Sequence, residues 1–539
     1  MRGKVSTTVV CSLLAGAAGV LCAPAALAQR AGNPGALVLV GHDVSPPLRQ
    51  IVPVEREPGQ RSIPLRPVGP RSSNVSDGAQ QTQVLPLVSA GGSLGFEGVG
   101  LGNGYAVNAA PPDTEGSVGY DAGAGMHQYV QWVNEAFAVF DADTGAQIYP
   151  KSSGAAAGNT IWSGFTDGNC DKNNDGDPIV LYDKAAHRWL MSQFSVTGGP
   201  PYYQCIAVSQ TSDATGAWNR YAYSFGNGFN DYPKFGVWPD AYYASFNIFN
   251  NGTTFAGPKV CAFDRAAMLS GATAGSVCFQ LSSSNGALLP SDLDGATPPP
   301  AGSPDYFVGL GSSTSLNVYK FHVDFATPAN STLTGPSAIT VASYNQACGG
   351  GACVPQPGTR QKLDSLGDRM MYRLAYRNFG NGQESLVVNH SVNVGSNKRS
   401  TYTAVRWYEL RVSNLTPSLH QQGTFAPNTN FRWMGSIGMD KVGNMLLGYS
   451  ESNSKSLYPS IFYTGRVPSD PLGTMETESS ILNGSGSQLP NLNRWGDYST
   501  MSIDPKDDCT FWYTQEYLGS SGTFNWRTYV KSVKFPSCS

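Results

Sequence analysis

The chain has 539 residues, of which only 14% are charged, and it contains 62 glycines and 36 prolines. This composition argues against a coiled coil, a helical solenoid and a disordered polymer, because long helices depend on Ala, Glu, Lys and Leu, and disordered chains are poor in aromatic residues. A formal net charge of −3 argues against a protein that binds nucleic acid through a basic surface. The length alone suggests two to four domains.

The N-terminus has the pattern of a secretory signal peptide, residues 1–28. Arg2 and Lys4 precede a mostly apolar stretch over 5–23, and Ala26-Leu27-Ala28 forms a small-residue cleavage site. A membrane anchor is the weaker interpretation, since Ser, Thr and Gly interrupt the apolar stretch. We therefore expect a secreted protein, extracellular or periplasmic, that does not associate with a membrane.

Eight cysteines follow the predicted signal peptide, and an even number in an exported chain favours disulfides. A zinc site is disfavoured because no C-x-x-C motif occurs. Many pairings are compatible with eight cysteines, and we favour pairing between sequence neighbours. The expected pairs are Cys170–Cys205, Cys261–Cys278, Cys348–Cys353 and Cys509–Cys538.

Two regions differ in composition after the signal peptide. Residues 29–104 are rich in Pro, Gly, Ser and Gln, which predicts an arm or linker, and a pro-segment is an alternative. In residues 105–539, short runs rich in Val, Tyr, Phe, Trp and Thr alternate with Gly, Asn and Asp turns. The best helical candidate is short, around Asp264–Leu269. An all-β fold is the expectation.

A repeat recurs seven times in residues 105–539. Each copy has a small or acidic first residue, a short strand, a turn with Asp or Gly, and a second strand with a polar end. Copies begin near Asp113, Asp177, Asp231, Asp305, Asp368, Ser436 and Asp497. Four-stranded units about 40 to 70 residues apart are typical of propeller blades. We predict one seven-bladed β-propeller of four-stranded antiparallel blades, with tandem sandwiches as the alternative.

Several long motifs resemble those of exported bacterial proteins with a sialidase-like propeller. They are GDPIVLYDKAAHRWLMSQF, NDYPKFGVWPDAYY, QKLDSLGDRMMYRLAYRN, RWMGSIGMDKVGN and RWGDYSTMSIDPKDDCTFWYT. The resemblance implies the fold and export more than an activity. Sialidases carry S-x-D-x-G-x-T-W boxes, and none is clear in this sequence, so sialidase activity is not implied.

The repeat also predicts where a site lies. The first strand of a blade lines the central channel, and the second strand returns beside it, so the start of one and the end of the other meet at the same mouth. The strand-start candidates are Asp113, Glu115, Asp177, Asp231, Asp368, Arg369, Ser436 and Asp497. The strand-end candidates are Asn134, Gln193, Asn247, His390, Glu451, Gln515 and Glu516. Trp433, Trp495, Tyr232 and Tyr498 are expected nearby.

This set of side chains suits a sugar polymer. Carboxylates and amides bond hydroxyl groups, and aromatic faces stack on sugar rings. Crowded carboxylates separate each other's pKa values, which produces a general acid and a base or nucleophile. The catalytic candidates are Glu115, Asp177, Asp231, Asp368, Arg369, His390, Asp497 and Glu516. The ligand-binding candidates are Asn134, Gln193, Asn247, Trp433, Glu451, Trp495 and Tyr498. A repeated Asp can instead cap a turn or join two blades.

A calcium site is a second candidate. Asp171, Asn173, Asp175 and Asp177 match the first half of a D-x-[DN]-x-[DN]-G loop, whose alternating oxygens converge on a hard cation. The glutamate that usually completes such a loop is missing, and a solvated Asx-rich turn is the alternative. We expect no required cofactor, with Ca²⁺ as a structural candidate.

Three functions follow from these patterns. The first is a glycoside hydrolase, or a polysaccharide lyase with His390 or a tyrosine as base and Arg369 neutralising a uronate. The second is a non-catalytic carbohydrate-binding, protein-binding or adhesion module, and the third is a structural surface protein. Whether the chain is an enzyme stays open at this point. The expected partner is an extracellular polysaccharide or glycan, and the expected state is a monomer.

Overall fold

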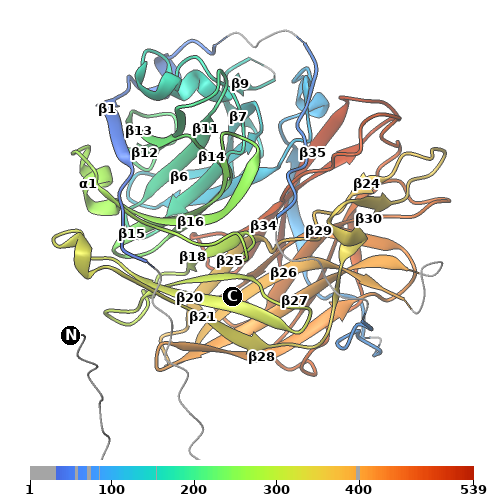
Figure 1. The fold of residues 1–539 in the computed structure, drawn as a ribbon. Coiled ribbons are helices and arrows are strands. Elements are labelled where there is room, and N and C mark those ends of the chain that lie inside the picture. The colour runs from blue at the N-terminus through green and yellow to red at the C-terminus, as the bar shows by residue number, and fades with distance from the viewer. Residues whose placement is uncertain (1–31, 55–58, 69–74, 84, 153, 396–400) are drawn as a thin grey trace, which may run out of the picture.

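The computed structural model describes residues 32–54, 59–68, 75–83, 85–152, 154–395 and 401–539. The predicted signal peptide lies outside these residues. Strands dominate, which confirms the all-β expectation (Figure 1). Helix α1 (Arg265–Ser270) occurs where the short helix was expected, with the Asp264 side chain accepting the Ala267 N–H at its start. Short 3₁₀ turns cover Leu48–Gln50, Leu101–Asn103, Gly158–Trp162, Asp167–Asn169, Pro328–Asn330 and Ala347–Gly350.

Most strands belong to antiparallel groups of four that follow the chain. The first three groups are β5 (Glu115–Asp121), β6 (Met126–Val133), β7 (Ala136–Asp141), β8 (Gln147–Tyr149); β10 (Ile179–Asp183), β11 (Arg188–Ser195), β12 (Tyr202–Ser209), β13 (Trp218–Gly226); and β14 (Gly228–Val237), β15 (Ala241–Asn250), β16 (Thr254–Asp264), β17 (Ser276–Gln280). The next two are β18 (Leu288–Asp294), β19 (Asp305–Leu310), β20 (Ser315–His322), β21 (Thr332–Thr340); and β25 (Met371–Asn378), β26 (Glu384–Val394), β27 (Tyr402–Ser413), β28 (Thr416–Phe425). The last two are β29 (Phe431–Met439), β30 (Met445–Ser452), β31 (Ser460–Arg466), β32 (Ser479–Leu482); and β33 (Thr500–Ile503), β34 (Thr510–Leu518), β35 (Trp526–Lys534), β3 (Gly91–Glu97).

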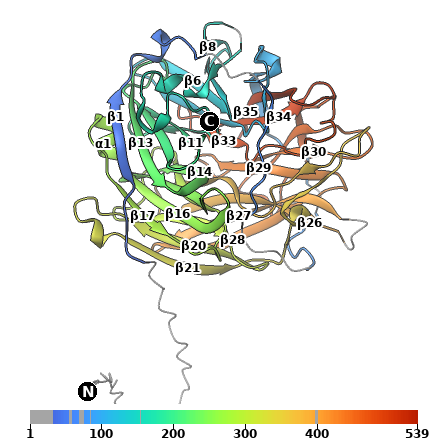
Figure 2. The same cartoon turned by 45° about the horizontal axis from the view of Figure 1, so that its top comes forward.

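The first strands of these groups form a closed circle. Strand β5 contacts β10, and the contacts continue through β14, β18, β25, β29 and β33 back to β5. The parallel pairing of β18 with β25 joins two groups into one sheet. Figure 2 shows the sheets arranged around a common centre. All first strands therefore begin near one another at one end of the circle.

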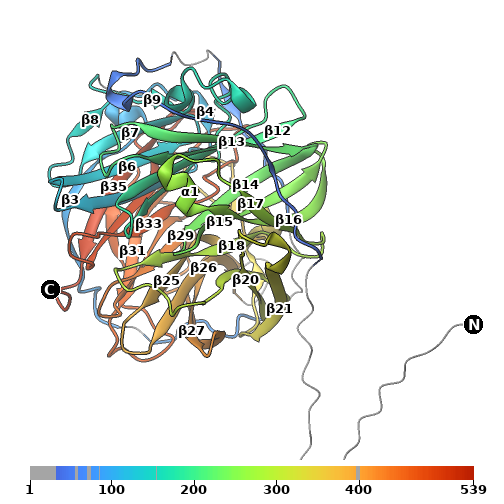
Figure 3. The ribbon, with the colours of Figure 1, turned by 90° about the vertical axis from the view of Figure 1, so that its left-hand side faces the viewer.

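The arm contributes strands to the sheets. Strand β1 (Val38–Val44) pairs with β13 along an outer edge, and β3 pairs with β35 (Figure 3). Residues from near both ends of the chain thus complete one sheet. The remaining strands are short: β2 (Arg61–Ser62), β4 (Ala109–Ala110), β9 (Ala156–Ala157), β22 (Asn345–Gln346), β23 (Ala352–Val354) and β24 (Leu363–Asp364).

The strands near the centre are buried on both faces. In β15, every residue except Asn250 is buried. Because neighbouring sheets cover both of its faces, such a strand is rich in Tyr, Phe and Ile instead of alternating between polar and apolar residues. Among the described residues, no helix is long and apolar enough to cross a membrane.

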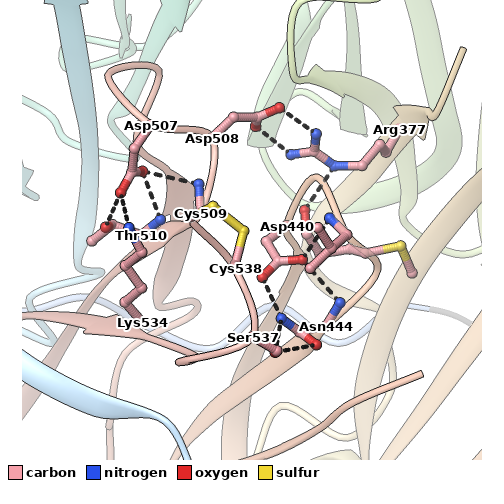
Figure 4. The surroundings of a disulfide bond; sticks show 12 residues. Arg377, Asp440, Asn444, Asp507, Asp508, Cys509, Thr510, Lys534, Ser537 and Cys538 are labelled. Carbon is pink, nitrogen blue, oxygen red and sulfur yellow. Dashed lines mark hydrogen bonds and ion pairs between the residues drawn. A yellow bond between two sulfur atoms is a disulfide. The ribbon is translucent and has the colours of Figure 1, made fainter. Parts of the chain in front are cut away.

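The four predicted disulfides are confirmed. They join Cys170–Cys205, Cys261–Cys278, Cys348–Cys353 and Cys509–Cys538. The last links the turn before β34 to the C-terminal segment, beside the Arg377–Asp508 ion pair at 2.7 Å (Figure 4).

Removing the Cys509–Cys538 disulfide is expected to cost more stability than removing Cys348–Cys353. The first closes a separation of 29 residues and the second of 5, so the longer one restricts the unfolded chain more. Double Cys→Ser variants should lose about 3 to 4 and about 2 kcal/mol of unfolding free energy, respectively. Urea unfolding of both variants measures this difference, and the reverse order would contradict it.

Candidate active site

Residues in or just before several of the first strands share an uncommon backbone geometry. Asp113, Asp177 and Tyr232 have φ angles of 49°, 47° and 53°. A positive φ is rare outside glycine and is tolerated best by Asp and Asn. Asp113 Oδ1 accepts the backbone N–H of Asp497 at 2.6 Å, and Asp177 Oδ2 accepts that of Tyr232 at 3.0 Å. These repeated aspartates therefore fasten neighbouring strand groups to one another.

Lys234 lies among these residues with a fully buried side chain. Its Nζ atom is 3.5 Å from the centroid of the Tyr498 ring and 4.0 Å from that of Tyr232. Burial lowers the pKa of Lys234 to about 8, and the charges of Asp177 and Glu115 oppose that shift. A cation enclosed by aromatic faces and carboxylates interacts strongly in an interior of low dielectric. Lys234 thus holds the surrounding acids together.

Glu115 is a fully buried acid near Lys234. Its Oε2 atom accepts the Thr500 hydroxyl at 2.8 Å, and its Oε1 atom has no hydrogen-bond partner among the described residues. Burial raises the pKa of Glu115 to about 8, although Lys234 lowers it in part. Glu115 therefore holds a proton at neutral pH.

A second group of acids lies around Arg494 at the same end of the circle of strands. Arg494 donates to Asp364 Oδ2 at 2.8 Å and forms a shorter ion pair with Asp497. Burial raises the pKa of Asp364 to about 7, with Arg494 opposing. The pKa of Glu516 is raised well above its ordinary value by burial and then by the charge of Asp113. Arg494, whose guanidinium is always charged, thus forms ion pairs with both Asp364 and Asp497.

Asp231 stands at the edge of the cluster. Its side chain keeps 12% of its surface exposed and lies 3.4 Å from Arg66 Nη1. Burial raises the pKa of Asp231 to about 7, and the nearby charge of Asp177 adds to the rise, whereas Arg66 and Arg369 oppose it. Asp231 and Asp497 also interact electrostatically. A carboxyl group with a raised pKa thus lies in the same cluster as the ion pair of Asp497 with Arg494.

Residues 61–68 of the arm, called the strap below, cross this end of the circle. The strap's Val68 N–H donates to Asp368 Oδ2 at 2.7 Å. Asp368 also pairs with Arg369 at 2.9 Å, and the Arg369 guanidinium lies 4.7 Å from the centroid of the Tyr232 ring. The strap is therefore part of the covering of the cluster.

A groove of about 410 Å³ lies beside the strap. Its walls include the aromatic side chains of Phe194, Tyr202 and Phe229, together with Arg66 and Asp175. Flat apolar rings among charged groups suit the faces and hydroxyls of a sugar. Asp231, through its contact with Arg66, adjoins this groove.

Three predicted strand-end amides are buried. Asn134 Oδ1 accepts the Asp177 N–H at 2.9 Å, so this residue joins two strand groups. Asn247 is the register partner of Asp231 across β14 and β15. Gln193 donates to the Asn173 carbonyl at 3.2 Å. The structure thus brings Asn134 and Asn247 next to predicted acids.

His390 lies between aromatic rings in β26. Its Nε2 atom is 2.9 Å from the Tyr408 hydroxyl, and Tyr344 packs edge-on at 4.6 Å between ring centroids. Burial and then the charge of Arg406 hold the pKa of His390 well below its ordinary value. Within the described residues, His390 contacts this aromatic group and not the acids around Lys234.

The tryptophans and Glu451 are also enclosed. The Trp433 and Trp495 rings pack with their centroids 5.8 Å apart, and both are fully buried. Glu451 pairs with Arg432 at 3.0 Å, and burial raises its pKa to about 7. The Tyr498 hydroxyl donates to the Pro178 carbonyl at 3.1 Å. The side chains of Trp433, Trp495, Glu451 and Tyr498 therefore contact other protein groups in this structure.

Three of the four calcium candidates use their side chains in separate hydrogen bonds. Asp175 Oδ2 accepts the Val196 N–H at 2.6 Å, and Asn173 donates to a serine hydroxyl at 2.9 Å. Asp177 accepts the Tyr232 N–H of the next strand group, and Asp171 Oδ1 has no hydrogen-bond partner among the described residues. Within the described part of the chain, no group of three or more His, Cys, Asp or Glu side chains could hold a metal ion.

Sequence reasoning missed Lys234, Arg494 and Asp364. Lys234 carried a usable signal, because it is a charged residue within the otherwise apolar run YPKFGV. Arg494 lies three residues before Asp497, so their proximity was visible in the sequence, whereas Asp364 in β24 reaches Arg494 only through the fold.

No protein-family model and no curated protein sequence matches the chain. Solved structures do match. An α-L-arabinofuranosidase from Fusarium graminearum, in complex with an iminosugar inhibitor, is 9% identical with a TM-score of 0.35, over 84% of this chain and 99% of that one. An endo-1,5-α-L-arabinanase from Thermotoga petrophila is 9% identical with a TM-score of 0.26, over 78% and 97%.

A protein of unknown function from Dyadobacter fermentans is 10% identical with a TM-score of 0.24, over 66% of this chain and 94% of that one. At such identities and TM-scores, these similarities assign neither an activity nor a substrate to this chain.

Proposed function

We propose that this chain is an exported carbohydrate-active hydrolase built on a seven-bladed β-propeller of the sialidase-like type. The closed circle of first strands and the four-strand groups around it support the propeller. The four disulfides support export. In this proposal, residues 1–28 are a signal peptide, 29–104 an arm and 105–539 the propeller, which acts as a monomer on an extracellular polysaccharide.

The observation that carries this function is the position of Asp231, which contacts Arg66 beside the groove, in the same acidic cluster as Asp497. Hydrolysis of a glycosidic bond needs one carboxyl that is protonated and one that is ionised. The raised pKa of Asp231, about 7, makes it the proton donor. Asp497, which forms an ion pair with Arg494, takes the second role in this proposal.

In the proposed reaction, Asp231 gives its proton to the leaving glycosidic oxygen. Asp497 takes a proton from a water molecule, whose oxygen forms the new bond to the anomeric carbon as the glycosidic bond breaks. The groove lined by Phe194, Tyr202 and Phe229 holds the sugar chain. The electrostatic environment of this pair at the mouth is determined by the other predicted residues, which are Glu115, Asp177, Asp368, Arg369 and Glu516.

Replacing Asp231 or Asp497 by asparagine is expected to reduce turnover at least about 100-fold, because the proton donor or acceptor is lost. The assay measures reducing ends released from a panel of polysaccharides that includes arabinan, arabinoxylan and polygalacturonate. The same panel is run with Arg66→Ala, in which the strap loses its side-chain contact with Asp231.

Asp213→Asn is the matched control, since Asp213 pairs with Arg49 at the surface, 38% exposed. Its turnover should equal that of the wild type. If neither the wild type nor Arg66→Ala releases product from any polymer, the proposed hydrolase is wrong. Full activity of both asparagine variants would exclude this acid pair.

A further inference from the structure

The strap is bound along the mouth mainly through its backbone. Ile63 is held on both sides, because its N–H donates to the Ala110 carbonyl at 2.8 Å and its carbonyl accepts from Arg494 Nε at 2.8 Å. The Arg66 carbonyl accepts from Arg369 Nη2 at 2.7 Å. These polar groups are spaced along an extended chain, as they are in a bound peptide.

The ends of the strap are fixed in the same manner. The Arg61 N–H donates to the Asn108 carbonyl at 2.7 Å, where β2 pairs with β4 in parallel. At the other end, the Val68 N–H donates to Asp368. Pro64 and Pro67 lie between these contacts, and proline favours the extended conformation that such binding needs.

The Arg66 side chain occupies a subsite of its own. Its guanidinium lies 4.2 Å from the centroid of the Phe229 ring and 3.4 Å from Asp231. Arg61 makes a similar contact with Glu135 at 2.6 Å. Two basic side chains of the strap thus meet two acidic side chains of the mouth.

The groups that receive the strap come from distant parts of the chain. Ala110, Asp231, Asp368 and Arg494 belong to four different strand groups or the segments between them. Arg369 and Arg494, the two buried arginines of the mouth, donate hydrogen bonds to carbonyl groups of the strap. A linker that only spans two sheets needs none of these arrangements.

We propose that this mouth is a binding site for an extended basic peptide with the pattern Ile-Pro-x-Arg-Pro-Val, and that the strap is its ligand within the chain. Peptide binding goes beyond the proposed hydrolase activity and does not depend on it. One consequence does rest on that activity: the peptide and a sugar chain compete for the space beside Asp231.

The test measures binding of a fluorescein-labelled peptide, RSIPLRPV, to the whole protein by fluorescence anisotropy. In the wild type, the strap competes at the high effective concentration of a tethered ligand. The variant Arg66→Ala/Val68→Pro removes the Arg66 subsite contacts and the N–H that Asp368 accepts. It should bind the peptide at least about 30-fold more tightly than the wild type, since an arginine contact within an interface is often worth about 2 kcal/mol.

Two controls isolate the Arg66 subsite. Arg49→Ala alters another arm residue, whose partner is Asp213, and should bind the peptide as the wild type does. The peptide RSIPLAPV should bind the double variant at least about tenfold more weakly than RSIPLRPV. If the double variant does not fold, Arg66→Ala alone carries the same measurement.

A folded strap variant that binds neither peptide, or both equally, would overturn the proposed peptide site. Peptide binding without release of sugar from any polymer would leave the peptide site standing and contradict the hydrolase. Sugar release without peptide binding would do the reverse. If both hold, the peptide should inhibit sugar release by the double variant in competition with the polysaccharide.

Discussion

Replacement of Lys234 by methionine is expected to lower the free energy of unfolding by about 3 to 5 kcal/mol. The ammonium is completely buried over Tyr498 and Tyr232, and the acids Asp177 and Glu115 face it. Methionine fills a similar volume but removes the cation near Asp177 and the hydrogen bond that Lys234 Nζ donates to the Pro233 carbonyl at 2.9 Å. Urea unfolding followed by tryptophan fluorescence at pH 7 measures the loss.

Lys534→Met is the matched control for this substitution. Its side chain is 39% exposed and pairs with Asp507 at 2.9 Å. An exposed pair of this kind contributes less than about 1 kcal/mol. An equal loss in the two variants would show that Lys234 does not organise the acids of the mouth.

Glu115→Gln is expected to make the protein less sensitive to pH between pH 5 and pH 8. Burial raises the pKa of Glu115 from 4.5 to about 8 in the folded chain. Between these values, the unfolded chain ionises this carboxyl while the folded chain keeps it protonated. Raising the pH therefore favours the unfolded chain, and the wild type loses stability that the glutamine variant keeps.

The measured quantity is the difference in unfolding free energy between Glu115→Gln and the wild type at pH 5, 6, 7 and 8. It should grow in favour of the variant by a few kcal/mol over this range. The range ends at pH 8 because the pKa of Lys234 is also about 8 in the folded chain. Above that pH, the loss of the Lys234 proton makes the folded chain more stable as the pH rises, which opposes the effect of Glu115.

Asp324→Asn provides the control for the pH series. The Thr327 N–H and then Asn330 lower the pKa of Asp324, so its ionisation is complete below pH 5 in both the folded and the unfolded chain. The difference between this variant and the wild type should stay constant from pH 5 to pH 8. A constant difference for Glu115→Gln as well would mean that Glu115 is ionised in the folded protein.

The disulfides and the short helix show what a local pattern can determine. Cys261 and Cys278 lie opposite each other on the paired strands β16 and β17, so their pairing follows from a short chain separation. The helix at Arg265–Ser270 begins at a capping aspartate and ends at Gly271, and both signals lie within a few residues.

The candidate site was accessible to sequence reasoning only where it repeats. Asp113, Asp177 and Asp231 recur at equivalent places, and the structure brings them to one end of the circle. Asp113 and Asp177 also accept backbone N–H groups from neighbouring strand groups. Those hydrogen bonds depend on how adjacent strand groups pack together. No spacing along the chain encodes those contacts.

The sequence by itself determined an all-β chain, four disulfides between cysteines that are neighbours in sequence, and a recurrent acidic turn. Short-range sequence patterns are enough to specify these features. Only the tertiary structure decided that Lys234 is the central cation and that the strap lies over the mouth. The strap has no periodicity, and its partners Asp368 and Arg494 lie 300 or more residues away. Its binding arises from backbone groups and converging side chains, which exist as a site only after the circle of strands has closed.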